Sequence, residues 1–279
     1  MRSRLLPWLM LAVGVALFVA AVAALKRMPL RLISLEMTTA LPRFVQVVLA
    51  GGDRYLAANV DVFRALTVSG KTSAVKLHVQ GQIHADAAWL NPAHEDNYYV
   101  AAAMLPWDGE FDAADAVLAA ATTARPFDAY PPFFRGFNHY YFRHDRLTGA
   151  RYLRVAAERA DSEQNRQAFE TIAARWTEKG AQPDEAVRIL AGMKETSRSA
   201  AVKVYLQQRI EHLQNLLALR AAADRYRERF HAPLGRLDDL VRSGLIPRIP
   251  QSLPDQVFVL DGDGVPISVN RPPNSEKKP

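Results

Sequence analysis

The sequence predicts an all-α protein in which an N-terminal transmembrane helix is followed by an α-solenoid of helical hairpins and by a small C-terminal helix plus β-hairpin. Three patterns support this prediction. An uncharged run of 21 residues near the N-terminus is long enough to span a bilayer. Small and apolar residues then recur every 36 residues, which is typical of stacked pairs of helices. Near the C-terminus apolar residues form two short β-like runs.

The composition favours a folded, cysteine-free protein. Its 279 residues are 49% hydrophobic and 23% charged, an ordinary balance for a chain that buries a core in one or two domains. With no cysteine, the chain has no disulfide, no thiolate metal site and no lipidated cysteine. The net charge of +6 is dispersed and no recognition-helix or glycine–aromatic pattern accompanies it, so we expect no nucleic-acid partner.

Residues 1–27 are predicted to form a membrane anchor. The uncharged run extends from Leu5 to Leu25, has basic residues on both sides and can cross about 30 Å of hydrocarbon. We therefore expect contact with membrane lipid through residues 5–25. The alternative is a cleaved signal peptide, because Ala21-Val-Ala23 fits a small-residue cleavage pattern.

Charge alone does not fix the orientation of the anchor, because the numbers of basic residues on its two sides nearly balance. We expect the short N-terminal tail to stay on the inner side. The protein is then a single-pass membrane protein, of the inner membrane if bacterial, with a periplasmic soluble domain. A cytoplasmic soluble domain is the alternative.

The next residues divide into a juxtamembrane segment, 28–52, and a region of helical repeats, 53–198. A pair of glycines marks the break between them, and Asp53 or Asn59 is expected to cap the first repeat helix. The partner helix is predicted from Ala74 to Leu90, with its apolar residues roughly in one stripe. Together they form a first, degraded hairpin.

The best-preserved hairpin spans residues 95–126. A helix from Glu95 to Leu105 places small residues on one face, where a neighbouring helix can approach closely. Pro106 to Gly109 breaks this helix, and a second helix from Glu110 to Thr123 carries apolar residues at helical spacing. Arg125-Pro126 ends the second helix, so the whole segment is predicted to be a helical hairpin.

Two registers relate this hairpin to its neighbours. One set of positions recurs every 36 residues and another every 34, so a two-residue insertion near Arg143-His144-Asp145 reconciles them. The 36-residue sets are Ala114, Ala150 and Ala186, then Val117, Leu153 and Ile189, then Ala121, Ala157 and Met193. The 34-residue pairs are Pro92 with Pro126, Ala87 with Ala121, and Ala102 with Gly136.

On these residues the chain resembles the tetratricopeptide repeat family. The resemblance rests on Tyr98, Ala101, Ala102 and Leu105 in the first helix, Gly109 and Phe111 at the turn, Ala114, Leu118 and Ala121 in the second helix, and the closing Pro126. It covers one unit well, whereas the units on either side are degraded, and Ala181 stands where the family usually has glycine. The resemblance implies stacked hairpins whose first helices line a concave groove for a partner peptide. An irregular helical bundle is the alternative.

The segment after this hairpin is the most aromatic part of the chain. Residues 124–142 contain eight Phe and Tyr residues, and a helix beginning near Pro132 accounts for most of them by packing. Because the resemblance implies a groove along the first helices, we predict that some rings bind a protein partner. The candidate partner-binding residues are Tyr99, Trp107, Phe133, Phe137 and Tyr140.

Residues 199–270 are predicted to form a C-terminal cap. A long helix from Ala200 to Phe230 is followed by a short helix at 237–241. Two β-like runs, 256–260 and 265–269, then predict a hairpin.

The turn between these runs, Asp261-Gly-Asp-Gly264, resembles the start of a calcium loop. Pro272 occupies the position of the twelfth ligand, so we expect a tight turn instead. Residues 271–279 are expected to be disordered.

No residue set in the sequence matches a known catalytic or metal-binding pattern. None of the histidines has the His-Glu-x-x-His spacing of a zinc protease, and no phosphate-loop or nucleophile-elbow motif is present. We therefore predict that the protein is not an enzyme and has no catalytic residues, metal or cofactor. The alternative is a hydrolase or metal-dependent enzyme that uses His139, His144 and Asp145.

These patterns together predict a membrane-anchored scaffold for protein–protein interaction, acting as an accessory or assembly subunit of an envelope membrane complex. Stacked helix pairs present a rigid concave surface, and aromatic side chains on it anchor a partner segment by burial. The alternative with the same architecture is a permanent structural subunit of a larger membrane complex.

Overall fold

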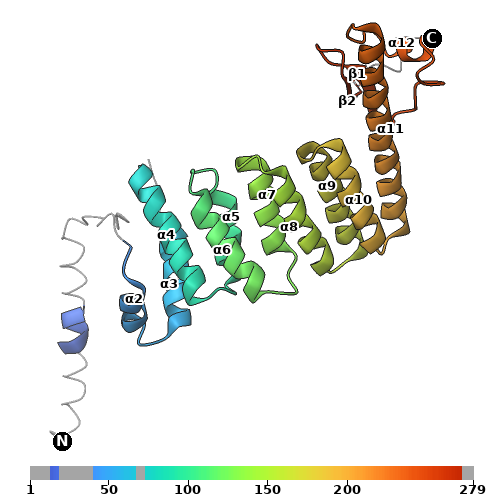
Figure 1. Ribbon diagram of the computed structural model, residues 1–279. Helices are drawn as coiled ribbons and strands as arrows, with labels where there is room; N and C mark the ends of the chain where they lie inside the picture. Colours follow the sequence, from blue (N-terminus) through green and yellow to red (C-terminus); the bar gives the residue numbers. More distant parts are fainter. Residues whose placement is uncertain (1–12, 19–39, 67–72, 272–279) are drawn as a thin grey trace, which may run out of the picture.

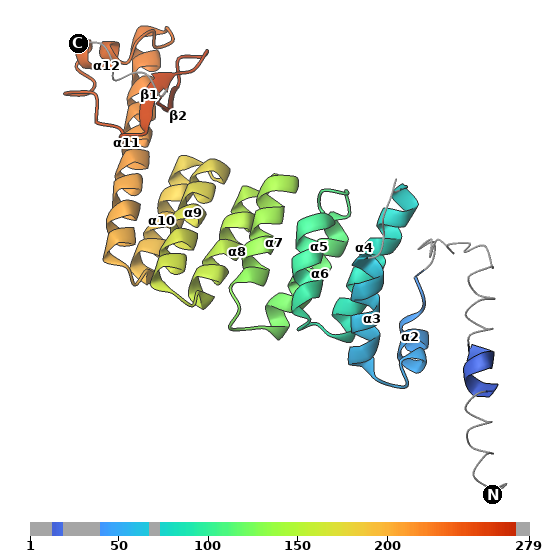
Figure 2. The same ribbon diagram turned by 180° about the vertical axis from the view of Figure 1, so that it is seen from behind.

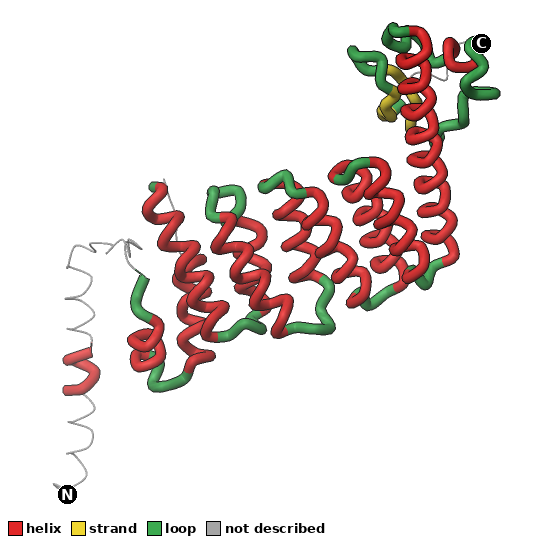
Figure 3. The backbone as a smooth tube through the Cα atoms, viewed as in Figure 1, coloured by secondary structure: helices red, strands yellow, loops and turns green. Residues whose placement is uncertain are grey.

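The computed structural model describes residues 13–18, 40–66 and 73–271. In these ranges the protein is predominantly helical, with a small two-stranded antiparallel sheet near the C-terminus (Figures 1 and 3). The elements are α2 (Arg43–Leu49), α3 (Arg54–Leu66), α4 (Ala74–Leu90), α5 (Glu95–Met104), α6 (Phe111–Ala124), α7 (Tyr130–Phe142), α8 (Arg146–Arg159), α9 (Glu163–Gly180), α10 (Pro183–Thr196), α11 (Ala200–Phe230), α12 (Asp238–Arg242), β1 (Gln256–Leu260) and β2 (Pro266–Asn270).

The helices from α3 to α10 stack side by side as consecutive antiparallel pairs and form an elongated array (Figures 1 and 2). The pairs are α3–α4, α5–α6, α7–α8 and α9–α10. At the far end α11 packs against α9 and α10 and then extends beyond the array, where α12 and the β-hairpin pack on its second half. The first helices of successive pairs, α5, α7 and α9, therefore follow one another along one side of the array.

Local signals set the ends of these helices. In five of the described helices the N-cap side chain accepts a hydrogen bond from a backbone N–H three residues later, which satisfies a donor that the helix leaves free. Asp53 accepts in the same way from Tyr55 and Leu56, at 2.8 and 3.2 Å, so it is the cap of α3. The five N-caps are Ser73, His94, Asp145, Ser162 and Ser199.

The boundaries of α4, α11 and β1 are those predicted. α7 begins at Tyr130, earlier than predicted, because Pro131 and Pro132 fit the first turn, where a helix needs no backbone N–H. β2 begins one residue later than predicted, because the Val265 N–H donates to the Asp261 side chain at 2.8 Å and so belongs to the turn.

Most of the residues that recur every 36 positions along the sequence lie in the core of the array. Ala114, Ala150 and Ala186 are buried, and so is Leu153, whereas Ile189 is only partly buried. Alanine at these positions allows neighbouring helices to approach closely. The buried core of the array is divided into several clusters, and its two largest involve α4 to α6 and α8 to α11.

The predicted membrane anchor lies largely outside the described residues. Of the run from Leu5 to Leu25 only residues 13–18 are described, and they are helical. Among the described ranges of the chain, no helix combines the length and the apolar character needed to cross a membrane. The juxtamembrane segment is described from residue 40, and the predicted disordered tail only at Arg271.

Asp61 in α3 is a buried carboxyl group, with 1% of its surface exposed. Arg64 donates to its Oδ1 atom at 3.0 Å, whereas within the described part of the chain Oδ2 has no hydrogen-bond partner. Burial raises the pKa of Asp61 from 3.8 to about 6, although Arg64 favours the charged form.

We expect Asp61→Asn to increase the free energy of unfolding at neutral pH by about 2 kcal/mol. Above its folded pKa of about 6 the carboxylate is charged in both states, so the folded state bears the cost of burying that charge. As the pH falls from about 6 toward 3.8, the folded state takes up a proton first and this cost disappears. Urea denaturation of both proteins at neutral and acidic pH measures the effect. An equal gain at both pH values would contradict the raised pKa.

Candidate functional site

A row of aromatic rings crosses the first helices of three successive pairs. Tyr99 on α5 meets the edge of Phe134 on α7, with ring centroids 5.5 Å apart. Phe134 contacts Phe133, and Phe133 contacts Phe169 on α9, each at 5.3 Å. Tyr130 lies 6.1 Å from Tyr99 and 6.2 Å from Phe134. These five rings, here called the aromatic row, join α5, α7 and α9.

Two other predicted partner-binding residues, Trp107 and Phe137, belong to a separate cluster near the C-terminal end of α7. Trp107 follows α5 in the turn and contacts Tyr141 at 5.3 Å and Phe142 at 4.9 Å. Phe137 stacks on Tyr141 at 5.6 Å. These contacts pack the turn between α5 and α6 against the C-terminal end of α7.

Tyr140 takes part in packing between helices. It is half-buried and stacks on Trp176 of α9, with ring centroids 4.2 Å apart. The five predicted residues therefore divide among three places: two in the aromatic row, two in the cluster at the end of α7, and Tyr140 between α7 and α9. Their role in binding a partner stays a prediction.

An open hollow of about 540 Å³ lies beside the aromatic row. Tyr99, Tyr130 and Phe169 line it together with Phe127, which is 92% exposed. Phe127 lies in the loop between α6 and α7, so helical spacing gives no signal for it. Phe169 is the only aromatic residue of the row on α9, and a single ring shows no periodicity. The hollow thus offers aromatic surface next to polar groups, a combination suited to a peptide segment.

The polar wall of this hollow is held in place by hydrogen bonds. Asp128 accepts from Arg125 Nε and from the Tyr98 hydroxyl, both at 2.8 Å, and Arg125 also donates to Glu95 at 2.9 Å. Burial disfavours the charged form of Asp128, but hydrogen bonds from Tyr130 N–H, Arg125 and Tyr98 hold its pKa below the ordinary value. The loop between α6 and α7 is therefore fixed to α5.

His139, His144 and Asp145, the residues of the predicted enzymatic alternative, have different roles in the structure. His139 Nε2 lies 3.2 Å from Asp115 Oδ1, and Asp115 also accepts two hydrogen bonds from Arg135 at 2.7 and 2.9 Å. Despite burial, these hydrogen bonds hold the pKa of Asp115 well below its ordinary value. His144 forms a turn with φ of 54°, and Asp145 caps α8. In the described ranges, no group of three or more His, Asp or Glu residues is placed to hold a metal ion.

Another histidine, His212 on α11, faces a serine of the C-terminal hairpin. Its Nε2 lies 2.8 Å from Ser268 Oγ, and its Nδ1 accepts from the Leu253 N–H at 3.3 Å. Burial lowers the pKa of His212, so the ring is neutral and Nε2 carries the proton. Ser268 in turn donates to Gln256 Oε1 at 3.0 Å. The pair joins the C-terminal hairpin to α11.

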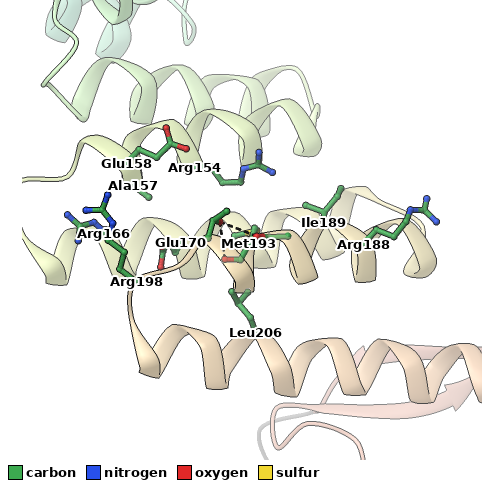
Figure 4. A pocket seen from close by; sticks show the side chains of 12 residues that line it. Arg154, Ala157, Glu158, Arg166, Glu170, Arg188, Ile189, Met193, Arg198 and Leu206 are labelled. Carbon is green, nitrogen blue, oxygen red and sulfur yellow. Dashed lines mark hydrogen bonds between the residues drawn. The ribbon is translucent and has the colours of Figure 1, made fainter.

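Another hollow, of about 450 Å³, lies between α8 and α10 (Figure 4). Its lining includes apolar residues such as Met193 and Leu206 and four arginines. Glu158 and Glu170 lie among the arginines, so the rim carries charges of both signs. The arginines are Arg154, Arg166, Arg188 and Arg198.

The fold and the candidate site together define a class of protein: a predominantly helical chain of stacked helix pairs with an aromatic row across its first helices. Comparisons with protein-family models, with curated proteins and with solved structures give no match.

Proposed function

We propose that this protein is a membrane-anchored, tetratricopeptide-like scaffold that binds a segment of a partner protein at the aromatic row, as an accessory or assembly subunit of an envelope membrane complex. The observation that carries the proposal is the aromatic row itself, in which rings from α5, α7 and α9 lie beside an open hollow. A partner segment in this hollow would contact Tyr99, Tyr130 and Phe169, one ring from each of these three helices.

Aromatic rings in such a position contribute substantially to binding. Ring–ring contacts add about 0.5–1.5 kcal/mol beyond the burial of apolar area, and a central interface residue contributes about 2 kcal/mol or more. Stacked helix pairs hold the rings in place before binding, so little conformational entropy is lost. An anchor at residues 5–25 would confine the protein to the membrane surface and raise its effective concentration toward a membrane-bound partner.

Three features support the tetratricopeptide-like interpretation. Gly109 in the turn between α5 and α6 has a φ of 85°, a conformation that glycine adopts readily. Tyr98 and Ala114, on facing helices of one pair, are both buried. A Cβ atom added to Gly136 on α7 would lie 2.8 Å from the Gly149 carbonyl oxygen on α8, so the small residue predicted there is required by close packing.

Replacement of Phe127 and Tyr130 by serine is expected to weaken capture of the partner from detergent-solubilised membranes by about tenfold or more. Both side chains are exposed, so the fold should tolerate the change. Phe230→Ser removes an exposed ring from α11, far from the hollow, and serves as the control. Quantitative mass spectrometry of proteins that co-purify with the tagged chain gives the measurement.

Capture that is equal for the double variant and the control would contradict binding at the aromatic row. Stoichiometric, salt-resistant co-purification that survives both changes would instead identify a permanent structural subunit. A metal ion found at unit stoichiometry in the purified protein would favour the enzymatic alternative.

A further inference from the structure

The first end of the array presents a large apolar surface. Among the described residues, exposed apolar side chains concentrate on α2 and α3, where Phe44 and Phe63 are 72% and 70% exposed. Leu49 of α2 and Leu56 and Val60 of α3 line one shallow hollow, so the two helices contribute to a common surface. The α2–α3 apolar surface consists of Phe44, Val48, Leu49, Leu56, Val60 and Phe63.

The helix α3 is apolar on two sides. Its small residues face α4 and are buried, whereas Leu56, Val60 and Phe63 follow one another at helical spacing and are exposed. The end of a helical array in water normally carries polar side chains. At the opposite end α11 follows this rule with exposed residues such as Lys203 and Glu211. An exposed apolar surface of this kind marks a site of contact with another protein or with a membrane.

The charges on α2 and α3 suit a lipid headgroup region. These helices contain Arg43, Arg54 and Arg64, of which Arg43 pairs with Asp86 of α4 and Arg64 with the buried Asp61, the only acidic residue in their described sequences. The exposed ring of Trp89 lies 5.1 Å from the Arg43 guanidinium and 5.8 Å from that of Arg54. Tryptophan and arginine are enriched where a protein meets the membrane–water interface, and anionic lipids attract basic residues there.

The chain length also places this surface near the bilayer. Residues 26 to 42, seventeen in all, connect the end of the apolar run at Leu25 with the start of α2. Fully extended, they span at most about 60 Å. If the apolar run is in the membrane, the first end of the array cannot move far from it.

We propose that the α2–α3 apolar surface lies on the lipid bilayer, with its apolar side chains at the boundary between headgroups and acyl chains. This contact and the anchor together hold the first end of the array against the membrane. The array, with the aromatic row on it, then extends away from the bilayer in a fixed direction. The proposal rests on the membrane anchor of the proposed function.

The absence of cysteine from the sequence allows a direct test in the full chain. Phe63→Cys and Val48→Cys place single nitroxide labels on the surface, and Val204→Cys places one on exposed α11 at the far end. The proteins are reconstituted in vesicles of phosphatidylethanolamine and phosphatidylglycerol. Electron paramagnetic resonance then compares collisions with oxygen, which concentrates in lipid, and with a water-soluble nickel complex. We expect oxygen to dominate for the first two labels and nickel for the third.

Three results would overturn the proposal. Labels at 63 and 48 that collide with nickel as often as the label at 204 would place the surface in water. Immobilised labels that neither reagent reaches would show that a polypeptide, such as a second copy of the chain, covers it. Either result contradicts this proposal alone when the chain also stays in the vesicles during an alkaline wash, because the anchor is then retained. Release of the chain by that wash would overturn the anchor and this inference together.

Discussion

Arg209→Met is expected to lower the free energy of unfolding by about 3 kcal/mol, because it leaves the Glu178 carboxylate buried without its partner. The two side chains are only 6% and 10% exposed. Arg209 donates from Nη2 to Glu178 Oε2 at 2.6 Å and from Nε to the other carboxylate oxygen. This ion pair connects α9 to α11, so its loss weakens the attachment of the C-terminal cap to the array. Urea denaturation followed by circular dichroism measures the change.

The double variant Glu178→Met, Arg209→Met is the critical comparison. Removing both charges also removes the cost of burying them, so we expect the double variant to be more stable than Arg209→Met alone. Arg188→Met is the matched control, because Arg188 pairs with Asp184 on the exposed side of α10 and its loss should change stability by about 0.5 kcal/mol or less. Equal losses of stability in Arg209→Met and Arg188→Met would show that the Arg209–Glu178 pair between α9 and α11 is solvated.

The pH dependence of Arg209→Met follows from the same pair. Burial raises the pKa of Glu178, and Arg209 opposes this increase. In the variant the opposition is gone, so the folded state prefers the protonated carboxyl group still more strongly. A carboxyl group with a raised folded pKa destabilises the fold above that pKa, and the effect is lost as the pH falls through it. The variant should therefore recover stability relative to wild type on acidification.

Most helices of the array could be predicted from the sequence because residues that favour helix ends lie on both sides of them. The range of α4 follows from Ser73 at its N-cap and Asn91 after it, and that of α11 from Ser199 and the left-handed His231. The predicted two-residue insertion near Arg143-His144-Asp145 falls at the turn between α7 and α8, where His144 has a positive φ. These signals are local, so a single sequence contains them.

The candidate site could be predicted only in part, because contacts between helices are not local. Spacing along α7 identifies Phe133 and Phe137 as residues of one helix, but it does not show that Phe133 meets Phe169 on α9 whereas Phe137 meets Tyr141. Those contacts depend on the distances between helices. The same holds for the polar wall, since Arg125 and Glu95 are 30 residues apart in the sequence.

The distance between α7 and α8 is set by two glycines, and Gly136→Ala is therefore expected to lower the free energy of unfolding by about 2 kcal/mol. A Cβ atom at Gly136 would lie 2.8 Å from the Gly149 carbonyl oxygen and 3.2 Å from the Tyr152 Cβ atom. The first contact is with backbone, which a rotamer change cannot relieve, so the helices must separate. Separation would also disturb the stacking of Tyr140 on Trp176, because Trp176 lies against Gly149.

Gly192→Ala provides the control for backbone effects. Gly192 lies within α10, and a Cβ atom there would meet nothing within 4 Å. Alanine in a helix interior is favoured over glycine by about 0.5–1 kcal/mol, so this variant should be more stable than wild type by that amount. Gly136→Ala gains the same preference, and the difference between the two variants isolates the cost of forcing α7 and α8 apart. If both variants were stabilised equally in urea denaturation, the close approach at Gly136 would not determine the packing of this pair, and the row of rings that α7 presents to α5 and α9 would need another explanation.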